Sequence, residues 1–130
     1  CLDLSICDRV EFLGYKEEIA RILSSSHVLL LTSYYEGTPN VVLESMACGR
    51  PVIATAVGDL PYILRDGIDG FIVPVGDIKA VAERLLLLAR DNVLLKKMGD
   101  SARKRVESDF TPSVSYNRIF EIYSMAGWKE

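Results

Sequence analysis

Two carboxylates lie on either side of a short turn, and together with the turn they could bind a phosphorylated ligand that carries hydroxyl groups. Glu36 precedes the turn at Gly37, and Glu44 lies one turn inside a helix expected to begin near residue 41. The amide groups at the start of such a helix favour an anion such as a phosphate. An ionised carboxylate only accepts hydrogen bonds, so it pairs well with neighbouring hydroxyl groups. A sugar nucleotide, which has a diol at each end of a diphosphate, suits all of these groups.

The segments around this turn must hold it in place, and they indicate strands alternating with helices. Short apolar runs predict strands at residues 10–13, 28–31, 51–54 and 71–73. Periodic apolar positions predict helices at residues 16–25, 41–48, 60–64, 78–90 and 93–107, with a last one from residue 111. This alternation is typical of an α/β, Rossmann-like parallel sheet with helices on both faces. Ligands of such sheets bind beyond the carboxyl ends of the strands, where the stretch 32–44 follows the second apolar run.

Residues that can cap helices support these boundaries. Asn40 and Asp77 are predicted N-caps, because their short polar side chains can accept a hydrogen bond from the first helical turn. Thr111 has the same role ahead of Pro112, which suits the first helical position. Gly49 is expected to end the helix that contains Glu44. The candidate site is therefore expected to lie between a strand and a well-defined helix.

The composition is that of one folded domain, and its charge disfavours nucleic acid as a partner. The chain has 130 residues, of which 49% are hydrophobic and 25% charged, so it can form a packed core. The formal net charge is -3, whereas nucleic-acid-binding domains usually carry a basic surplus. No apolar run approaches the roughly 20 residues that cross a bilayer. We therefore expect a globular protein that does not bind nucleic acid.

The cysteine and histidine content gives no support for a metal site. Cys1, Cys7 and Cys48 form an odd set without a paired motif, which is typical of reduced thiols in the cytoplasm. His27 is the one histidine and precedes a predicted strand, so we interpret it as structural. The start of the chain has neither the basic region nor the apolar core of a secretory signal. A cytoplasmic location is expected, with the full-length protein at the cytoplasmic membrane surface as a further possibility.

A longer match gives these features a specific meaning. Glu36-Gly-Thr-Pro-Asn-Val-Val-Leu-Glu44, followed by Ser-Met-Ala-Cys-Gly-Arg-Pro-Val-Ile-Ala54, resembles the Glu-x7-Glu region of retaining GT-B glycosyltransferases of the family 4 type. The segments 10–14, 57–61 and 70–73 are similar to other parts of that family, and the resemblance covers roughly residues 9–125. The chain departs from the family at Asp59, where a second glycine is frequent, and at Tyr62, where glutamate is frequent.

The resemblance implies a role for each residue of the motif. Glu36 is implied to be the catalytic-site carboxylate, as a sugar binder and electrostatic stabiliser rather than a proven nucleophile, and Glu44 is implied to hold the ribose diol. The other implied donor-binding positions are Ser33 beside the diphosphate, Gly37, Thr38, Pro39 and Asn40 in the turn, and Gly14 and Tyr15 near the base. The resemblance also implies a metal-free reaction with retention of anomeric configuration, and no cofactor besides the nucleotide-diphosphate sugar.

Charge around the motif suggests that further parts of the protein are needed. No Lys or Arg occurs between Arg21 and Arg50, although a diphosphate and two glutamates would bring about four negative charges together. A helix dipole contributes only about 0.3–1 kcal/mol at an exposed site, so cations should come from elsewhere. The resemblance implies an Arg and a Lys upstream of residue 1. Together with the low strand count and the absence of an initial Met, this predicts an incomplete C-terminal half of a GT-B fold.

Two regions are therefore expected. Residues 1–110 are predicted to form part of the donor-binding domain, and residues 111–130 a helix that packs back toward an absent N-terminal acceptor domain. An ordinary helix packed on its own domain is the alternative for the second region. The fragment would bind the donor without turnover, while the full-length enzyme would transfer the sugar to a sugar, lipid or protein.

Two other functions remain open from the residues alone. A nucleotide-sugar epimerase shares this architecture, but it would need more histidines and carboxylates than the chain offers. A domain of the same fold that only binds a nucleotide or a protein is the second alternative.

Overall fold

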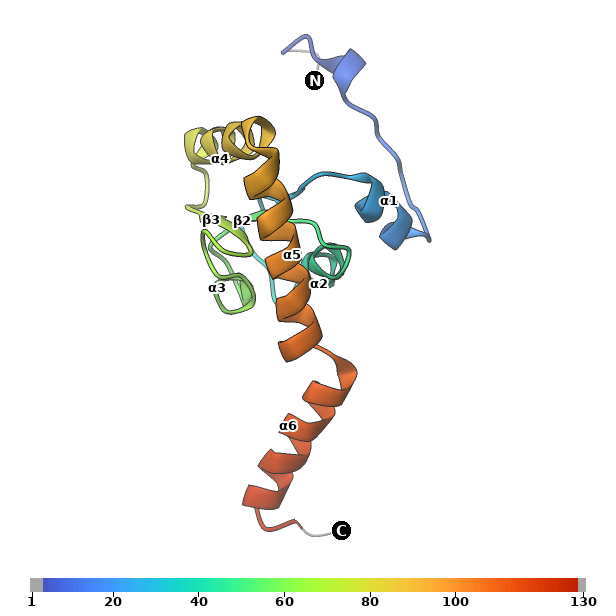
Figure 1. Ribbon diagram of the computed structural model, residues 1–130, viewed down its shortest axis with the longest axis vertical. Helices are drawn as coiled ribbons and strands as arrows, with labels where there is room; N and C mark the ends of the chain where they lie inside the picture. Colours follow the sequence, from blue (N-terminus) through green and yellow to red (C-terminus); the bar gives the residue numbers. More distant parts are fainter. Residues whose placement is uncertain (1–3, 129–130) are drawn as a thin grey trace.

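The computed structural model describes residues 4–128, in which three strands alternate with helices and two long helices complete the chain (Figure 1). In chain order the elements are a 3-10 helix Cys7–Arg9, α1 Ile19–Ser25, β1 Leu29–Leu31, α2 Asn40–Ala47, β2 Val52–Thr55, α3 Leu60–Ile63, β3 Gly70–Val73, α4 Ile78–Arg90, α5 Asn92–Asp109 and α6 Pro112–Met125. None of the helices in the described part of the chain is long and apolar enough to cross a membrane.

The strands form a parallel sheet in the order β1-β2-β3. Every residue of β2 is buried, since this strand has a neighbour on each side and helices above and below. Side chains alternate along a strand, so Val52 and Ala54 pack into one hydrophobic cluster and Ile53 into the other. The predicted α/β sheet with helices on both faces is confirmed.

Each face of the sheet has its own set of helices. Val42 of α2 and Leu60 of α3 pack on the face of Val52 and Ala54. On the other face, Leu88 of α4 joins the cluster around Ile53. Helix α5 reaches both clusters, through Met98 on one side and Ala102 on the other, and thereby ties the two faces together.

The backbone of helix α5 lies directly against the backbone of the turn between α2 and β2. A Cβ atom added to Gly99 of α5 would lie 2.2 Å from the carbonyl oxygen of Gly49. Gly49 has a φ of +68°, and it follows the residue that caps α2, which confirms the predicted end of that helix. Only a glycine at position 99 allows this approach, so the position of α5 on the sheet is fixed there.

Three predictions about the elements are wrong in detail. The run 10–13 forms no strand, because no other strand of the described chain lies beside it to supply hydrogen bonds. Helix α1 begins at Ile19 rather than at residue 16. Asn40 is not an N-cap: it is the first helical residue, and Pro39, whose side chain cannot accept a hydrogen bond, occupies the cap position. The other two predicted caps are confirmed, since Asp77 accepts from the amide of Ala80 and Thr111 from that of Val114.

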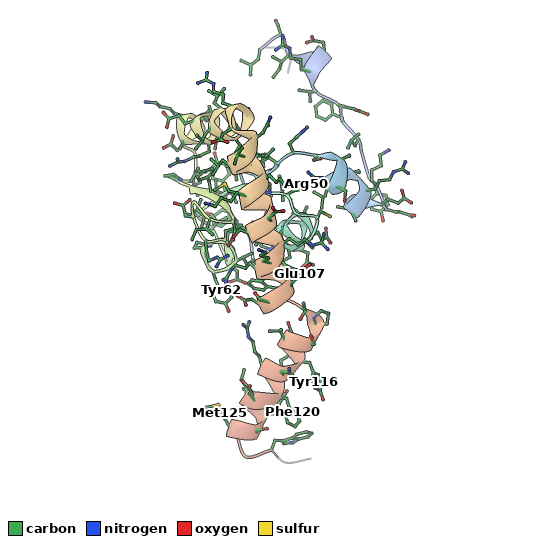
Figure 2. All side chains as sticks on the ribbon, viewed as in Figure 1. Arg50, Tyr62, Glu107, Tyr116, Phe120 and Met125 are labelled. Atoms are coloured by element: carbon green, nitrogen blue, oxygen red, sulfur yellow. The ribbon has the colours of Figure 1, made fainter. Side chains whose placement is uncertain are left out.

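Helix α6 extends away from the sheet and its covering helices (Figure 1), and it has no buried residue. The structure therefore buries no residue of α6 against the sheet, and both interpretations of residues 111–130 stay predictions. Apolar side chains along α6 are exposed, among them Ile119, Ile122 and Met125. Figure 2 shows Phe120 and Met125 on this projecting helix, far from the hydrophobic clusters.

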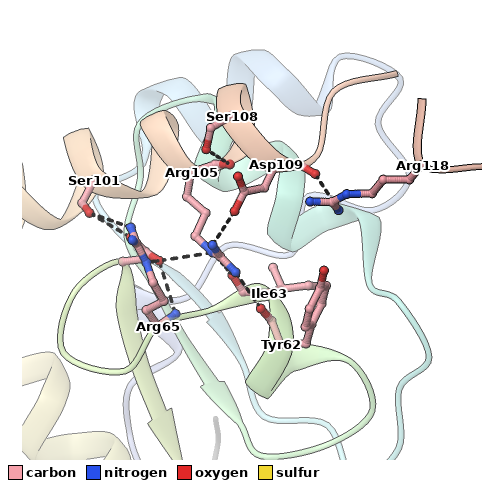
Figure 3. A network of polar contacts seen from close by, with 9 residues as sticks. Tyr62, Ile63, Arg65, Ser101, Arg105, Ser108, Asp109 and Arg118 are labelled. Atoms are coloured by element: carbon pink, nitrogen blue, oxygen red, sulfur yellow. Dashed lines mark hydrogen bonds and ion pairs between the residues drawn. The ribbon is translucent and has the colours of Figure 1, made fainter. Parts of the chain in front are cut away.

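A polar network joins the turn before β3 to α5 (Figure 3). The carboxylate of Asp69 is fully buried and accepts two hydrogen bonds of 2.7 Å from the guanidinium of Arg65 and one of 2.8 Å from the hydroxyl of Ser101. Arg105 of α5 lies 3.8 Å from the same carboxylate and donates to the carbonyl oxygens of Tyr62 and Ile63. The network therefore fastens α3 and the following turn to α5.

The balance of forces at Asp69 sets the direction of its titration. Burial of the carboxyl disfavours its ionised form, but the hydrogen bonds from Arg65 and Ser101 outweigh burial and hold the pKa of Asp69 below its ordinary value. A carboxyl with a lowered folded-state pKa stabilises the fold at pH values above the ordinary value of about 3.9. This contribution is lost as the pH falls through the lowered folded-state pKa.

We predict that the free energy of unfolding falls as the pH drops below about 4 and that Asp69→Asn reduces this slope. The variant should also lose about 2–4 kcal/mol at pH 7, because Arg65 and Arg105 lose their buried partner. Urea unfolding at a series of pH values measures both effects. Asp100→Asn, which changes an exposed carboxylate on α5, is the control and should keep the wild-type slope. An unchanged slope in Asp69→Asn would contradict the assignment.

Candidate functional site

The loop after β1 brings Ser33 and Glu36 together at the carboxyl edge of the sheet. The hydroxyl of Ser33 donates to Oε1 of Glu36 at 2.6 Å, and the carbonyl oxygen of Ser33 accepts from the hydroxyl of Thr55 at 2.6 Å. Thr55 is the last residue of β2 and is buried, so it anchors the loop to the central strand. Glu36 is half-buried, and its carboxylate is thereby oriented before a ligand arrives.

The loop after β2 holds the other side of the turn. A Cβ atom added to Gly58 would lie 2.3 Å from the carbonyl oxygen of Glu36 and 2.6 Å from that of Gly37, so the two backbones are in direct contact. The amide of Asp59 donates to the carbonyl oxygen of Gly37 at 3.1 Å, and its carboxylate accepts from the hydroxyl of Thr38. Asp59, one of the two positions at which this chain departs from the family it resembles, therefore helps to position the candidate site.

The start of α2 continues directly from this turn. Pro39 is buried in the cap position, Asn40 is exposed, and the first amides of a helix have no partner within the helix itself. Glu44 is exposed one turn further along α2. The motif thus presents one oriented carboxylate, a helix start and a second, solvent-accessible carboxylate in succession, which is an arrangement that can hold an anion between two hydroxyl-bearing groups.

Gly14 and Tyr15 are not joined to this loop in the structure. Both lie before α1 in a segment without regular secondary structure; Gly14 has a φ of +63° and Tyr15 is 88% exposed. Tyr15 lines a surface hollow with Lys16 and Arg21, beside α1. The expected contact of these residues with a base therefore stays a prediction.

A cavity of 320 Å³ opens at the carboxyl ends of all three strands. Thr32 and Tyr34 come from the loop after β1, Thr55 from the end of β2, and Asp77 from the start of α4. Ile78 and Val81 of α4 supply an apolar wall. The cavity adjoins the Glu36 loop, because Thr32 precedes Ser33 and Thr55 bonds to Ser33.

Sequence reasoning missed Thr55, Gly58 and Asp59. They follow a predicted buried strand, and the rule that placed the Glu36 loop at the carboxyl edge could have placed this loop beside it. Nothing in the sequence indicated that Ile78 and Val81 of α4 line the cavity. Their position there depends on how α4 packs on the sheet. Within residues 4–128, no group of three or more His, Cys, Asp or Glu lies close enough to hold a metal ion.

Known proteins share both this sequence pattern and this fold. Residues 2–91 match the family model described as glycosyl transferases group 1. N-acetyl-alpha-D-glucosaminyl L-malate synthase of Bacillus anthracis is 38% identical over 121 residues, which are 93% of this chain and 32% of the relative. Sucrose-phosphate synthase of Thermosynechococcus elongatus superposes with a TM-score of 0.88 at 31% identity, covering 96% of this chain and 32% of that one.

A further solved structure shares the fold at lower identity. HepE of Anabaena, in complex with UDP, superposes with a TM-score of 0.90 at 24% identity, covering 95% of this chain and 34% of that one. These solved structures support the predicted GT-B fold class. The chain spans about a third of the length of each of these proteins.

The contact between Gly58 and the Glu36 loop leads to a stability prediction. Gly58→Ala should lower the free energy of unfolding by about 1–3 kcal/mol beyond the cost of its positive φ, and should shift the amide signals of Gly37 and Thr38 in NMR spectra. Gly67→Ala is the matched control, because Gly67 also has a positive φ but has open space around the Cβ position. Equal losses in the two variants would show that the backbone contact does not constrain the loop.

Proposed function

This chain belongs to the group 1 glycosyl transferases, and we propose that it is the part of such an enzyme that binds the nucleotide-diphosphate sugar donor. The observation that carries the proposal is the Ser33–Glu36 pair at the carboxyl edge of the sheet, directly ahead of the start of α2. Its supports are the open cavity beside that pair and the position of both in a fold whose ligands bind at this edge.

Within the site, each side chain has a distinct proposed task. Glu36 accepts hydrogen bonds from the donor sugar and stabilises positive charge that develops as the sugar leaves the diphosphate. Its hydrogen bond to Ser33 keeps the carboxylate oriented, so little reorganisation accompanies the reaction. The amides of Gly37, Thr38 and Asn40 bind sugar hydroxyls and phosphate oxygens.

Glu44 is proposed to accept both hydroxyls of the ribose. It is exposed on α2 one helical turn beyond Asn40, so a ligand can approach it from solvent. The ribose and the sugar would then lie at opposite ends of the diphosphate, with the helix start between them. Gly14 and Tyr15 are proposed to face the base, which requires the segment before α1 to approach α2, against which α1 already packs.

For the full-length protein we propose sugar transfer with retention of anomeric configuration, without a metal ion or another cofactor. The acceptor would be bound by a separate domain, toward which residues 111–130 extend, and residues 1–110 would belong to the donor domain. The exposed apolar side chains of α6 support this arrangement, since apolar surface of that extent favours a partner. A cytoplasmic location belongs to the same proposal.

Calorimetric titration with UDP, GDP and ADP sugars tests the donor site. One nucleotide should bind, and Glu44→Ala should weaken that binding by about tenfold to a hundredfold, the usual range for losing hydrogen bonds to a charged group. Glu83→Ala removes an exposed glutamate from α4 and is the matched control, for which no change is expected.

Two outcomes would count against the proposal. Equal affinity of the wild type and Glu44→Ala would remove Glu44 from the ribose site. A failure of all three nucleotides to bind the wild type would show that this chain does not hold the donor on its own.

A further inference from the structure

The amino edge of the sheet, opposite the Glu36 loop, carries a cavity with a basic lining. Its volume is 380 Å³, and His27, Arg50, Lys96 and Arg103 line it together with one acidic residue, Asp100. His27 precedes β1 and Arg50 precedes β2, and since the strands are parallel, both residues lie at the same edge. Helix α5 supplies Lys96 and Arg103, so the basic residues come from three separate segments of the chain.

Close packing fixes these segments relative to one another. The contact of Gly99 with the carbonyl oxygen of Gly49 places α5 directly on the turn that contains Arg50. Met98 and Ala102 bury the inner side of α5, which leaves Lys96 and Arg103 on its outer side. The packing of α5 on the core therefore fixes the segments that carry Arg50, Lys96 and Arg103 relative to one another.

The hydrogen bonding of Arg50 is incomplete. One of its terminal nitrogens donates to the carbonyl oxygen of Ser24, and Figure 2 shows Arg50 between α1 and α5. Its Nε atom is buried and, within the described residues, has no hydrogen-bond partner. A buried donor without an acceptor is unfavourable, and Arg50 also lines the cavity, so this guanidinium has hydrogen-bonding capacity that its protein neighbours do not use.

The charges around the cavity favour an anion. Lys96 forms no ion pair in the part of the chain that the structure describes, while Arg103 pairs with Glu107 at 2.8 Å. An adjoining hollow on α5 adds Lys97 and Lys104. This local excess of cations stands in a chain whose formal net charge is -3.

We propose that this amino-edge cavity is a second, phosphate-binding site, separate from the donor site and independent of its function. Guanidinium and ammonium groups match phosphate oxygens in charge and hydrogen-bonding geometry. The phosphate could belong to a soluble phosphorylated ligand or to a lipid headgroup, and the experiment below distinguishes these sources. Arg50 and Arg103 contact the phosphate oxygens, and Lys96 adds a charge at the rim.

Titration of sodium pyrophosphate into the chain at low ionic strength tests the site, because salt screens such contacts. We expect saturable binding, with Lys96→Gln and Arg103→Gln each weakening the affinity about threefold to tenfold. Both side chains are exposed, so neither change removes core packing. NMR amide shifts should centre on Gly49 and Arg50.

Lys79→Gln is the matched control. Lys79 is an exposed cation on α4 with a glutamate four residues later, as Arg103 has on α5. Its replacement should leave the affinity unchanged. The proposal is overturned by an equal loss in Lys79→Gln, by amide shifts centred on Gly37 and Thr38, or by the absence of binding to the wild type.

Vesicle sedimentation identifies the source of the phosphate. Pelleting with phosphatidylglycerol vesicles but not with phosphatidylcholine vesicles, reduced in Lys96→Gln and Arg103→Gln, assigns the site to a lipid headgroup. Pyrophosphate binding without pelleting assigns it to a soluble phosphorylated ligand.

Discussion

The complete burial of β2 is the constraint on which the rest of the structure depends. A strand with apolar side chains on both faces and a neighbour on each side can be stable only when helices cover both faces. Helices α2 and α3 cover one face, α4 covers the other, and α5 packs on both. This arrangement fixes where β2 begins and ends, and therefore where Arg50 lies before it and Thr55 at its end.

The two edges of the sheet consequently have different chemistry. At the carboxyl edge, Thr55 and the following loop hold Ser33 and Glu36 in hydroxyl-rich and acidic surroundings. At the amino edge, Arg50 and α5 create basic surroundings. One sheet thus separates a proposed sugar-nucleotide site from a proposed phosphate site, because a parallel sheet gathers all strand ends of one kind at one edge.

Close backbone contacts at two glycines fix the positions of the loops at both edges of the sheet. Gly58 lies against Glu36 and Gly37, and Gly99 lies against Gly49, each at a distance that a side chain would prevent. Direct backbone packing leaves little room for adjustment, so the loops at each edge have one position relative to the sheet. The network around Asp69 has a comparable effect on α3 and the turn before β3.

The sequence by itself determined the order and type of most elements and the helix caps at Asp77 and Thr111, because these depend on periodicity and on residues close in the chain. It also placed Glu36 and Glu44 on either side of one turn, which is where the proposed donor site begins. It did not determine whether residues 10–13 form a strand. A strand exists only through hydrogen bonds to a neighbouring strand, which the local sequence does not specify. Only the tertiary structure decided that Asp59 supports the turn at Thr38 and that Arg50, Lys96 and Arg103 share one cavity. Such contacts join residues that are far apart in the chain, and it is the packing of helices on β2 that brings them together.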